Sequence, residues 1–140
     1  MKLSIRLFFI LYSLGLLYLM FFGFGRTQMP HNIVRLSPFL STLKFMQNSF
    51  SDWMTLVNLF GNILVFIPFG FLGLVDEKYK DLKTLMIHFL SVLIIVEFLQ
   101  YFTRLGVFDI DDLLLNTLGL IFGFFIFKLI LKIYDKNHKF

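Results

Sequence analysis

The stretch that decides the fold is Val96–Gly123, VEFLQYFTRLGVFDIDDLLLNTLGLIFG, which joins two long apolar segments of the chain. In its first half, Glu97, Gln100 and Arg104 are three and four residues apart, so a helix places them on one face. The second half repeats polar and small residues at steps of four, three and four, again on one face: Asp112, Asn116, Gly119 and Gly123. If the flanking segments cross a membrane, two polar stripes meet at one end of a helical hairpin. Ionisable groups at membrane depth indicate a functional site.

The composition places the chain in a lipid bilayer. Of its 140 residues, 58% are hydrophobic and 16% are charged, and its mean hydropathy is +0.81. A soluble domain of this length exposes too much surface to carry so few charges. The chain has no cysteine, which excludes disulfides and thiolate chemistry, and it lacks the common nucleotide-binding, zinc-protease and serine-hydrolase motifs. We therefore expect one domain over residues 1–140, no cofactor, and binding rather than catalysis.

Four apolar segments are long enough to cross a bilayer, which takes about 20 helical residues: 3–24, 53–75, 83–102 and 112–132. The first is too long for a typical signal peptide and no small-residue cleavage site follows it, so we expect it to be retained. In the second, Pro68 is expected to kink the helix. Between them, Ser37-Pro38 is typical of a helix start, and the apolar periodicity that follows predicts an amphipathic helix over about 38–50. The predicted fold is an all-α integral membrane four-helix bundle with an amphipathic interfacial helix in the first extracytoplasmic loop.

The basic residues predict the orientation of the bundle. Nine Lys and Arg lie in the N-terminus, the 76–83 turn and the C-terminal end, and four lie in the other two connections. The positive-inside rule then places both termini in the cytoplasm. The net charge of +4 is explained by this topology, so no nucleic-acid partner is predicted.

With this topology, polar residues of three spans gather at the outward-facing end: Asn58, Asn62, Glu97, Gln100, Arg104, Asp109, Asp112 and Asn116. A buried Glu97 needs a partner or a proton, and Arg104, two turns away, is expected to reach back to it. These residues could form a polar clasp between helices, or bind an anionic ligand through Arg104. Alternatively, Glu97 and the acidic turn with Asp109, Asp111 and Asp112 could hold a divalent cation. His88 has no other ligand-type residue nearby in sequence and indicates helix packing instead of a metal site.

Three segments then suggest a family: NLFGNILVFIPFGFLG (58–73), VEFLQYFTRLGVFDIDDLLLNTLG (96–119) and, more weakly, RLSPF (35–39). In this order they resemble the VanZ-like family of small bacterial membrane proteins, although Arg35 stands where the family often has Asn. The resemblance implies a multi-pass protein of the bacterial cytoplasmic membrane. The family takes its name from a member associated with resistance to the glycopeptide teicoplanin. The polar pattern of the family falls on the same eight residues without assigning them roles.

Three functions are compatible with these features. The first is an envelope protein whose outward-facing pocket binds an amphiphilic or lipid-linked ligand, such as a lipoglycopeptide, and so contributes to glycopeptide resistance. The second is an intramembrane lipid-modifying enzyme, a metal-assisted hydrolase or transferase, with Glu97 or Asp112 as general base. The third is an accessory subunit that packs against a larger membrane complex. The expected partners are the lipid bilayer, the ligand and, for the third function, other membrane proteins.

Overall fold

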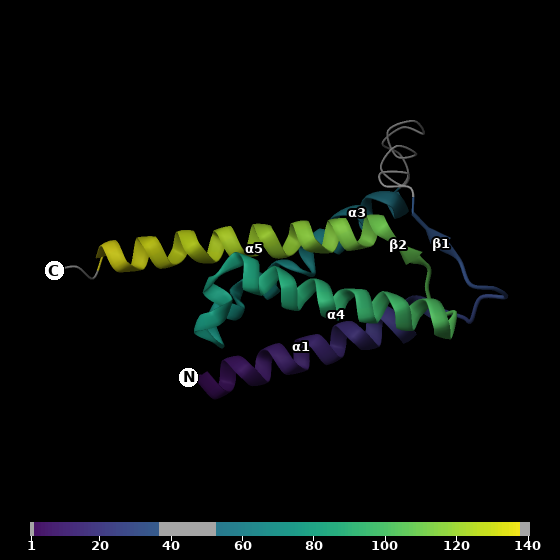
Figure 1. Cartoon of the computed structure of the whole chain (residues 1–140), viewed down its shortest axis with the longest axis horizontal. Coiled ribbons are helices and arrows are strands. Elements are labelled where there is room, and N and C mark those ends of the chain that lie inside the picture. Colours follow the sequence, from purple (N-terminus) through teal and green to yellow (C-terminus); the bar gives the residue numbers. More distant parts are fainter. Residues whose placement is uncertain (1, 37–52, 138–140) are drawn as a thin grey trace.

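The computed structural model describes residues 2–36 and 53–137, and within them the chain is almost entirely helical (Figure 1). The α-helices are α1 (Lys2–Phe22), α3 (Trp53–Leu64), α4 (Leu82–Thr103) and α5 (Ile110–Asn137). The 3₁₀ helices are η1 (Gly23–Gly25), η2 (Ile67–Leu74) and η3 (Glu77–Lys80). Two short strands, β1 (Val34–Arg35) and β2 (Phe108–Asp109), complete the described part. The predicted amphipathic helix over about 38–50 lies outside the described residues.

Three of the α-helices are long and apolar enough to cross a membrane: Leu3–Phe22, Leu82–Thr103 and Ile110–Asn137. The remaining predicted span, 53–75, forms two helical pieces, because α3 ends at Leu64 and a turn leads into η2. Pro68 lies in the first turn of η2, where its missing N–H leaves the backbone bond to the preceding turn unmade. The predicted all-α membrane fold is confirmed, with this segment broken at the predicted proline.

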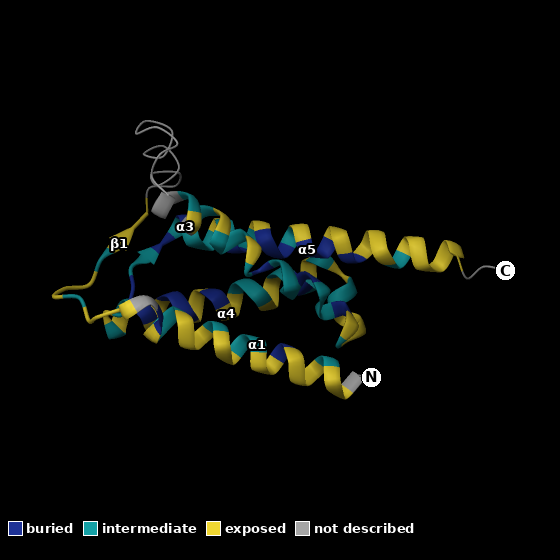
Figure 2. Ribbon diagram, turned by 180° about the vertical axis from the view of Figure 1, so that it is seen from behind, coloured by how far each residue is buried: buried dark blue, intermediate teal, exposed yellow. Residues whose placement is uncertain are grey.

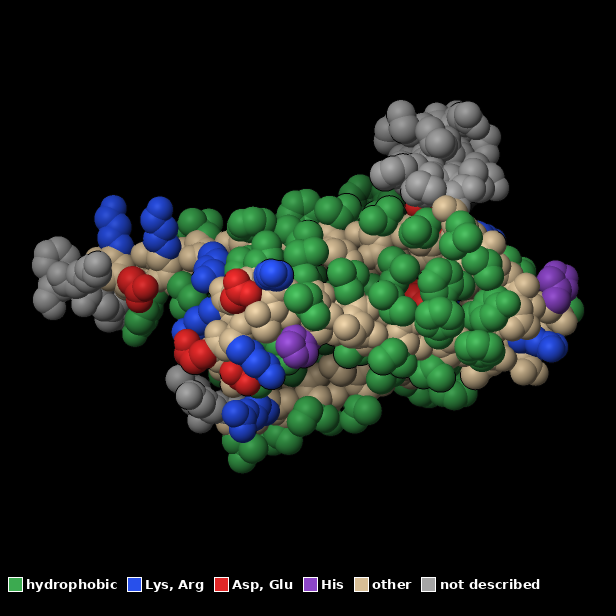
Figure 3. Space-filling view, viewed as in Figure 1, with side chains coloured by type: hydrophobic (Ala, Val, Ile, Leu, Met, Phe, Trp, Pro, Cys, Tyr) green, Lys and Arg blue, Asp and Glu red, His purple; other side chains and the backbone are tan. Residues whose placement is uncertain are grey.

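The four segments alternate in direction, so both ends of the chain lie at the same end of the molecule (Figure 1). The two strands and the start of α5 lie at the opposite end. Charged side chains gather near the termini, over η3 and the last turns of α5, and hydrophobic side chains cover the flanks of the bundle (Figure 3). This is the distribution expected of a protein whose sides face lipid and whose ends face water.

The broken segment packs closely against α5. A Cβ on Gly119 would overlap the carbonyl oxygen of Ile63, and a Cβ on Gly123 would overlap that of Ile67. On the other side of this contact, a Cβ on Gly70 would overlap the backbone of α5 at Phe124. Small residues at such spacing let helix backbones approach in lipid. We call this contact the glycine seam.

The apolar core lies beside the glycine seam. Leu85, Leu120 and Phe124 form the buried cluster, and η2 and the first turns of α4 cover it. By contrast, α1 lies at the edge of the bundle. Phe9 is its one buried side chain among the described residues, and its outer face is exposed along its length (Figure 2). Lipid is the solvent expected for this face.

Candidate functional site

A two-stranded sheet fixes the connection between α4 and α5. β1 pairs with β2 in parallel, with Val34 opposite Phe108 and Arg35 opposite Asp109. The Phe108 N–H donates to the Ile33 carbonyl at 3.1 Å, just before the paired residues. The loop after α1 is thereby tied to the residues that begin α5.

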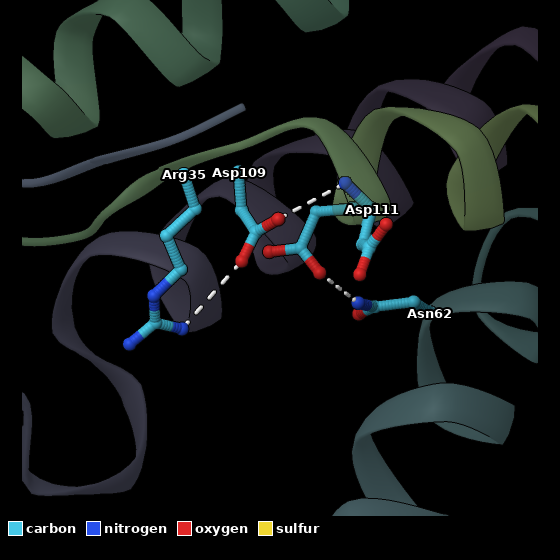
Figure 4. Close-up of polar contacts among 5 residues, drawn as sticks. Arg35, Asn62, Asp109 and Asp111 are labelled. Carbon is cyan, nitrogen blue, oxygen red and sulfur yellow. Dashed lines mark hydrogen bonds and ion pairs between the residues drawn. The ribbon is translucent and has the colours of Figure 1, made fainter. Parts of the chain in front are cut away.

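Asp109 connects this sheet to the helices. One of its carboxylate oxygens lies 3.5 Å from the Arg35 guanidinium, and the other accepts the Asp111 backbone N–H at 3.0 Å (Figure 4). The Asp109 carboxylate thus satisfies a backbone donor at the start of α5, as an N-terminal cap does. In addition, the backbone of Asp109 donates a hydrogen bond to the carboxylate of Glu97 on α4.

Asn62 joins α3 to α5. Its amide nitrogen donates to a carboxylate oxygen of Asp112 at 2.6 Å, a short, charge-assisted hydrogen bond (Figure 4). Asn58 lies one turn earlier on α3, but its side chain is outside what the structure describes. The predicted meeting of the second and fourth spans therefore occurs through Asn62 and Asp112.

Glu97 is the most deeply buried acid among the described residues, with 1% of its surface exposed. The charges that act on it come from Asp112, Asp109 and Arg26. Its Oε2 has no hydrogen-bond partner among the described residues, and the same is true of Oδ1 of Asn116, which is 2% exposed. Leaving a buried acceptor unpaired costs about 1–3 kcal/mol, and more for a charged group. Both oxygens can therefore accept a hydrogen bond from an external donor, and the Glu97 carboxylate can take a proton instead.

Gln100 has a partner on another helix. It is 4% exposed, and its amide nitrogen donates to the Met20 carbonyl at 2.9 Å. This bond attaches the last turn of α1 to α4, one turn beyond Glu97. Gln100 thus holds helices together, whatever else it does.

Arg104 lies elsewhere than predicted. It follows the last residue of α4 as the C-cap and has the left-handed conformation, with φ of 59°. From there its side chain donates to Asn32 Oδ1 at 3.1 Å and to the Pro30 carbonyl at 3.3 Å. The expected pairing of Arg104 with Glu97 is wrong, because the left-handed turn directs the guanidinium to the loop after α1.

Arg26 is the basic residue that sequence reasoning missed. It follows η1, donates to the Leu105 carbonyl at 2.9 Å, and is the cation that acts on both Glu97 and Asp112. Nothing in the sequence separates it from other loop arginines, since its proximity depends on the folding of the loop over the end of α4.

We refer to five of these residues as the polar cluster: Asn62, Glu97, Asp109, Asp112 and Asn116. Within the described residues, no three His, Cys, Asp or Glu side chains come together in a way that could hold a metal ion. The placement of the acids therefore gives no support to the divalent-cation alternative. The cluster is rich in acceptors and is suited to a proton, an ammonium group or hydroxyl donors.

Two cavities open on the flanks of the bundle, and neither is lined by the polar cluster. One of 490 Å³ lies between the first turns of α1 and η2. The other, of 290 Å³, lies between α1, η2 and α4. Both are almost wholly apolar, so the predicted polar pocket is a buried cluster of side chains next to an apolar cavity.

Helices of membrane-spanning length and a cluster of acidic side chains at one end of the bundle define an α-helical integral membrane protein. The family profile VanZ/LLP1 matches residues 9–131. The chain belongs to the VanZ-like family, which confirms the resemblance seen in the sequence. No curated protein and no solved structure matches the chain.

Proposed function

We propose that this chain is a VanZ-type envelope protein whose polar cluster binds the head group of an amphiphilic or lipid-linked ligand. In this proposal both termini are cytoplasmic, as the basic residues predict, and the cluster faces the outer side of the cytoplasmic membrane. The observation that carries it is a pair of buried acceptors without a partner among the described residues: Glu97 Oε2 in the last two turns of α4 and Asn116 Oδ1 in the first two turns of α5.

The chemistry of the cluster favours a ligand that donates hydrogen bonds. Four of its five members present carboxylate oxygens or an unpaired amide oxygen, and the nearby guanidinium of Arg26 already donates to a backbone carbonyl. An ammonium or hydroxyl group would satisfy the two free acceptors, and hydrogen bonds to charged groups contribute about 1.5–3 kcal/mol each. The anionic ligand expected from Arg104 is less favoured, because that side chain is bound to the loop.

Family membership supports the biological setting of this proposal. Binding of a lipoglycopeptide, or of the cell-wall lipid intermediate that such an antibiotic targets, would lower the antibiotic's effect at the membrane surface. We therefore propose a contribution to resistance against teicoplanin-like glycopeptides.

Substitution of Glu97 tests the proposal. Glu97→Gln keeps the shape of the side chain and removes its negative charge, whereas Glu77→Gln makes the same change at an exposed site on η3. Loss of one charge-assisted hydrogen bond corresponds to about tenfold weaker binding or more. We expect Glu97→Gln to lose the ligand seen by native mass spectrometry of the purified protein, and to lose protection against teicoplanin in a sensitive host. Glu77→Gln should behave like the natural protein in both assays.

The melting temperature separates binding from a purely structural clasp. If the cluster only locks helices together, Glu97→Gln changes thermal stability in detergent, and no ligand is found on the natural protein. A natural protein that carries no ligand and gives no protection would refute the proposal.

One observation favours a second function, catalysis on a lipid. Glu97 is buried, Asp112 on a different helix is half-buried, and the two carboxyl groups act on each other electrostatically. Two interacting carboxyl groups are a common arrangement for general acid–base catalysis. Incubation of the purified protein with lipid extracts distinguishes the two functions, because an enzyme converts a lipid that a binding protein returns unchanged.

A further inference from the structure

The 290 Å³ cavity between α1, η2 and α4 has a defined length and two different ends. Along α4 its lining runs from Leu85 to Val96, a distance of eleven steps along the helix, or about 16 Å at 1.5 Å per residue. At the end nearer the termini it is lined by Tyr79 and His88, whose rings are in edge-to-face contact. At the other end it is lined by Val96 and Met20. The cavity is therefore a long apolar slot parallel to the helices.

The second of these ends lies directly beside the polar cluster. Val96 precedes Glu97, which has the unpaired oxygen, and the Met20 carbonyl accepts the hydrogen bond of Gln100. Glu97 also lies one helical turn beyond Leu93 of the lining, so on this face of α4 an almost wholly apolar lining is followed by a buried carboxylate. An amphiphile has the same arrangement, because its polar head group is followed by a hydrocarbon chain.

The slot is also open to the bilayer. Val92 and His88 line it and are both exposed, so it opens on the flank between α1 and α4. The described hydrogen bonds and ring contacts that join α1 to the rest of the bundle are few: the Tyr12 hydroxyl bound to the Val65 carbonyl at 2.7 Å, the Gln100 bond, and ring contacts at Phe69. A helix held by so few contacts can separate from its neighbour at low cost.

The size of the slot fits one hydrocarbon chain. One water molecule in liquid water occupies ~30 Å³, and a methylene group has a similar volume. A volume of 290 Å³ therefore accommodates about ten methylenes. Protein interiors are close-packed, and an apolar void that opens into lipid is filled by the apolar molecules next to it.

We infer that this slot takes one hydrocarbon chain of the amphiphile whose head group binds at the polar cluster. The inference rests on the proposed function and narrows its ligand class to a long-chain amphiphile with an amine or hydroxyl-bearing head group. The hydrocarbon chain enters sideways from the bilayer between α1 and α4, and the ligand never leaves the membrane.

Photolabelling in proteoliposomes tests the inference. The probe is phosphatidylethanolamine with a diazirine in the middle of one acyl chain, because its ammonium group complements Glu97 and Asp112. We expect labelled peptides to come from 13–20 and 85–96. Leu16→Trp, which fills the slot from the loosely held α1, should lower this labelling by about tenfold, because a filled interior excludes a second occupant. Leu14→Trp adds the same ring on the exposed face of α1 outside the slot and should leave labelling unchanged.

Glu97→Gln in the same assay separates failure of this inference from failure of the proposed function. The inference predicts that Glu97→Gln also lowers labelling, because head group and chain belong to one ligand. If Glu97→Gln abolishes ligand binding but Leu16→Trp has no effect on labelling, the hydrocarbon chain lies elsewhere and only the inference fails.

If Leu16→Trp blocks labelling and Glu97→Gln does not, the slot holds a bulk lipid that is independent of the polar cluster. That result also overturns the inference. If neither variant matters, both proposals fail. The label positions on the natural protein decide the question without any variant, since labels outside the slot refute it.

Discussion

The glycine seam gives the most specific prediction about stability. Gly119 and Gly123 of α5 face the carbonyl oxygens of Ile63 and Ile67, and in each case the atom in the way of a Cβ belongs to the backbone. A backbone atom cannot move aside as the end of a side chain does. We therefore expect Gly123→Ala to push α5 away from the broken segment, although alanine is the better helix former.

The size of the effect follows from two opposing terms. Overpacking costs about 1–3 kcal/mol, and a rigid obstacle places this substitution near the upper value. Replacing a helical glycine by alanine contributes up to about 1 kcal/mol in the opposite direction. The net expectation for Gly123→Ala is a loss of about 2 kcal/mol in the free energy of unfolding.

Gly61→Ala is the matched control. Gly61 is also helical, in α3, but a Cβ there would meet nothing within 4 Å. The free energy of unfolding of Gly61→Ala should rise by up to about 1 kcal/mol, so the two variants should differ in it by about 3 kcal/mol. Denaturant unfolding in detergent micelles, followed by circular dichroism, measures this difference. Equal stability of Gly123→Ala and Gly61→Ala would refute the close packing of α5 on η2.

Three further predictions concern single hydrogen-bonded sites. Asn62→Ala removes the donor to Asp112 and should destabilise the protein by about 1–3 kcal/mol in the same unfolding assay, whereas an unchanged stability would contradict this bond. Hydrogen bonds from the Thr84 N–H and then the Thr84 hydroxyl lower the pKa of Asp81 below its ordinary 3.8, so its stabilising contribution is complete above that pH and disappears as the pH falls below it. Asp81→Ala should therefore lower the melting temperature at pH 7 and have little effect at pH 2, and an equal effect at both values would argue against this cap. Arg104→Ala and Arg104→Gly lose the same loop contacts, but the left-handed backbone should make the glycine variant more stable by about 1 kcal/mol, the reverse of the usual helix ranking.

The long helices could be predicted from the sequence because membrane spans obey a simple rule. Every backbone polar group in lipid must be satisfied within the segment, so an apolar run of sufficient length has few alternatives to a helix. The break near Pro68 was also predictable, since proline removes one backbone donor. The change to a 3₁₀ helix over Ile67–Leu74 was not, because its apolar sequence is equally compatible with an α-helix.

The candidate site was predicted in composition and only partly in connectivity. The bond between Asn62 and Asp112 is of the predicted kind, since helical periodicity places these residues on inward faces at the same end. The side chain of Arg104 could not be placed by periodicity, because α4 ends at Thr103 and Arg104, the residue that follows, has a left-handed backbone conformation. The pairing of β1 with β2 had no sequence signal either, since two residues are too short for an alternating pattern.

One face of α5 carries residues of both the polar cluster and the glycine seam. Asp112 and Asn116 belong to the polar cluster, and Gly119 and Gly123 continue the same stripe into the glycine seam. The seam sets how closely α5 approaches α3, and this distance determines whether Asn62 reaches Asp112 with a short hydrogen bond. A bulky residue at Gly119 should therefore weaken ligand binding without touching the ligand, and a change at Glu97 should weaken binding without opening the seam. Measuring ligand binding and the free energy of unfolding for both variants separates the residues that bind the ligand from the residues that hold them in place.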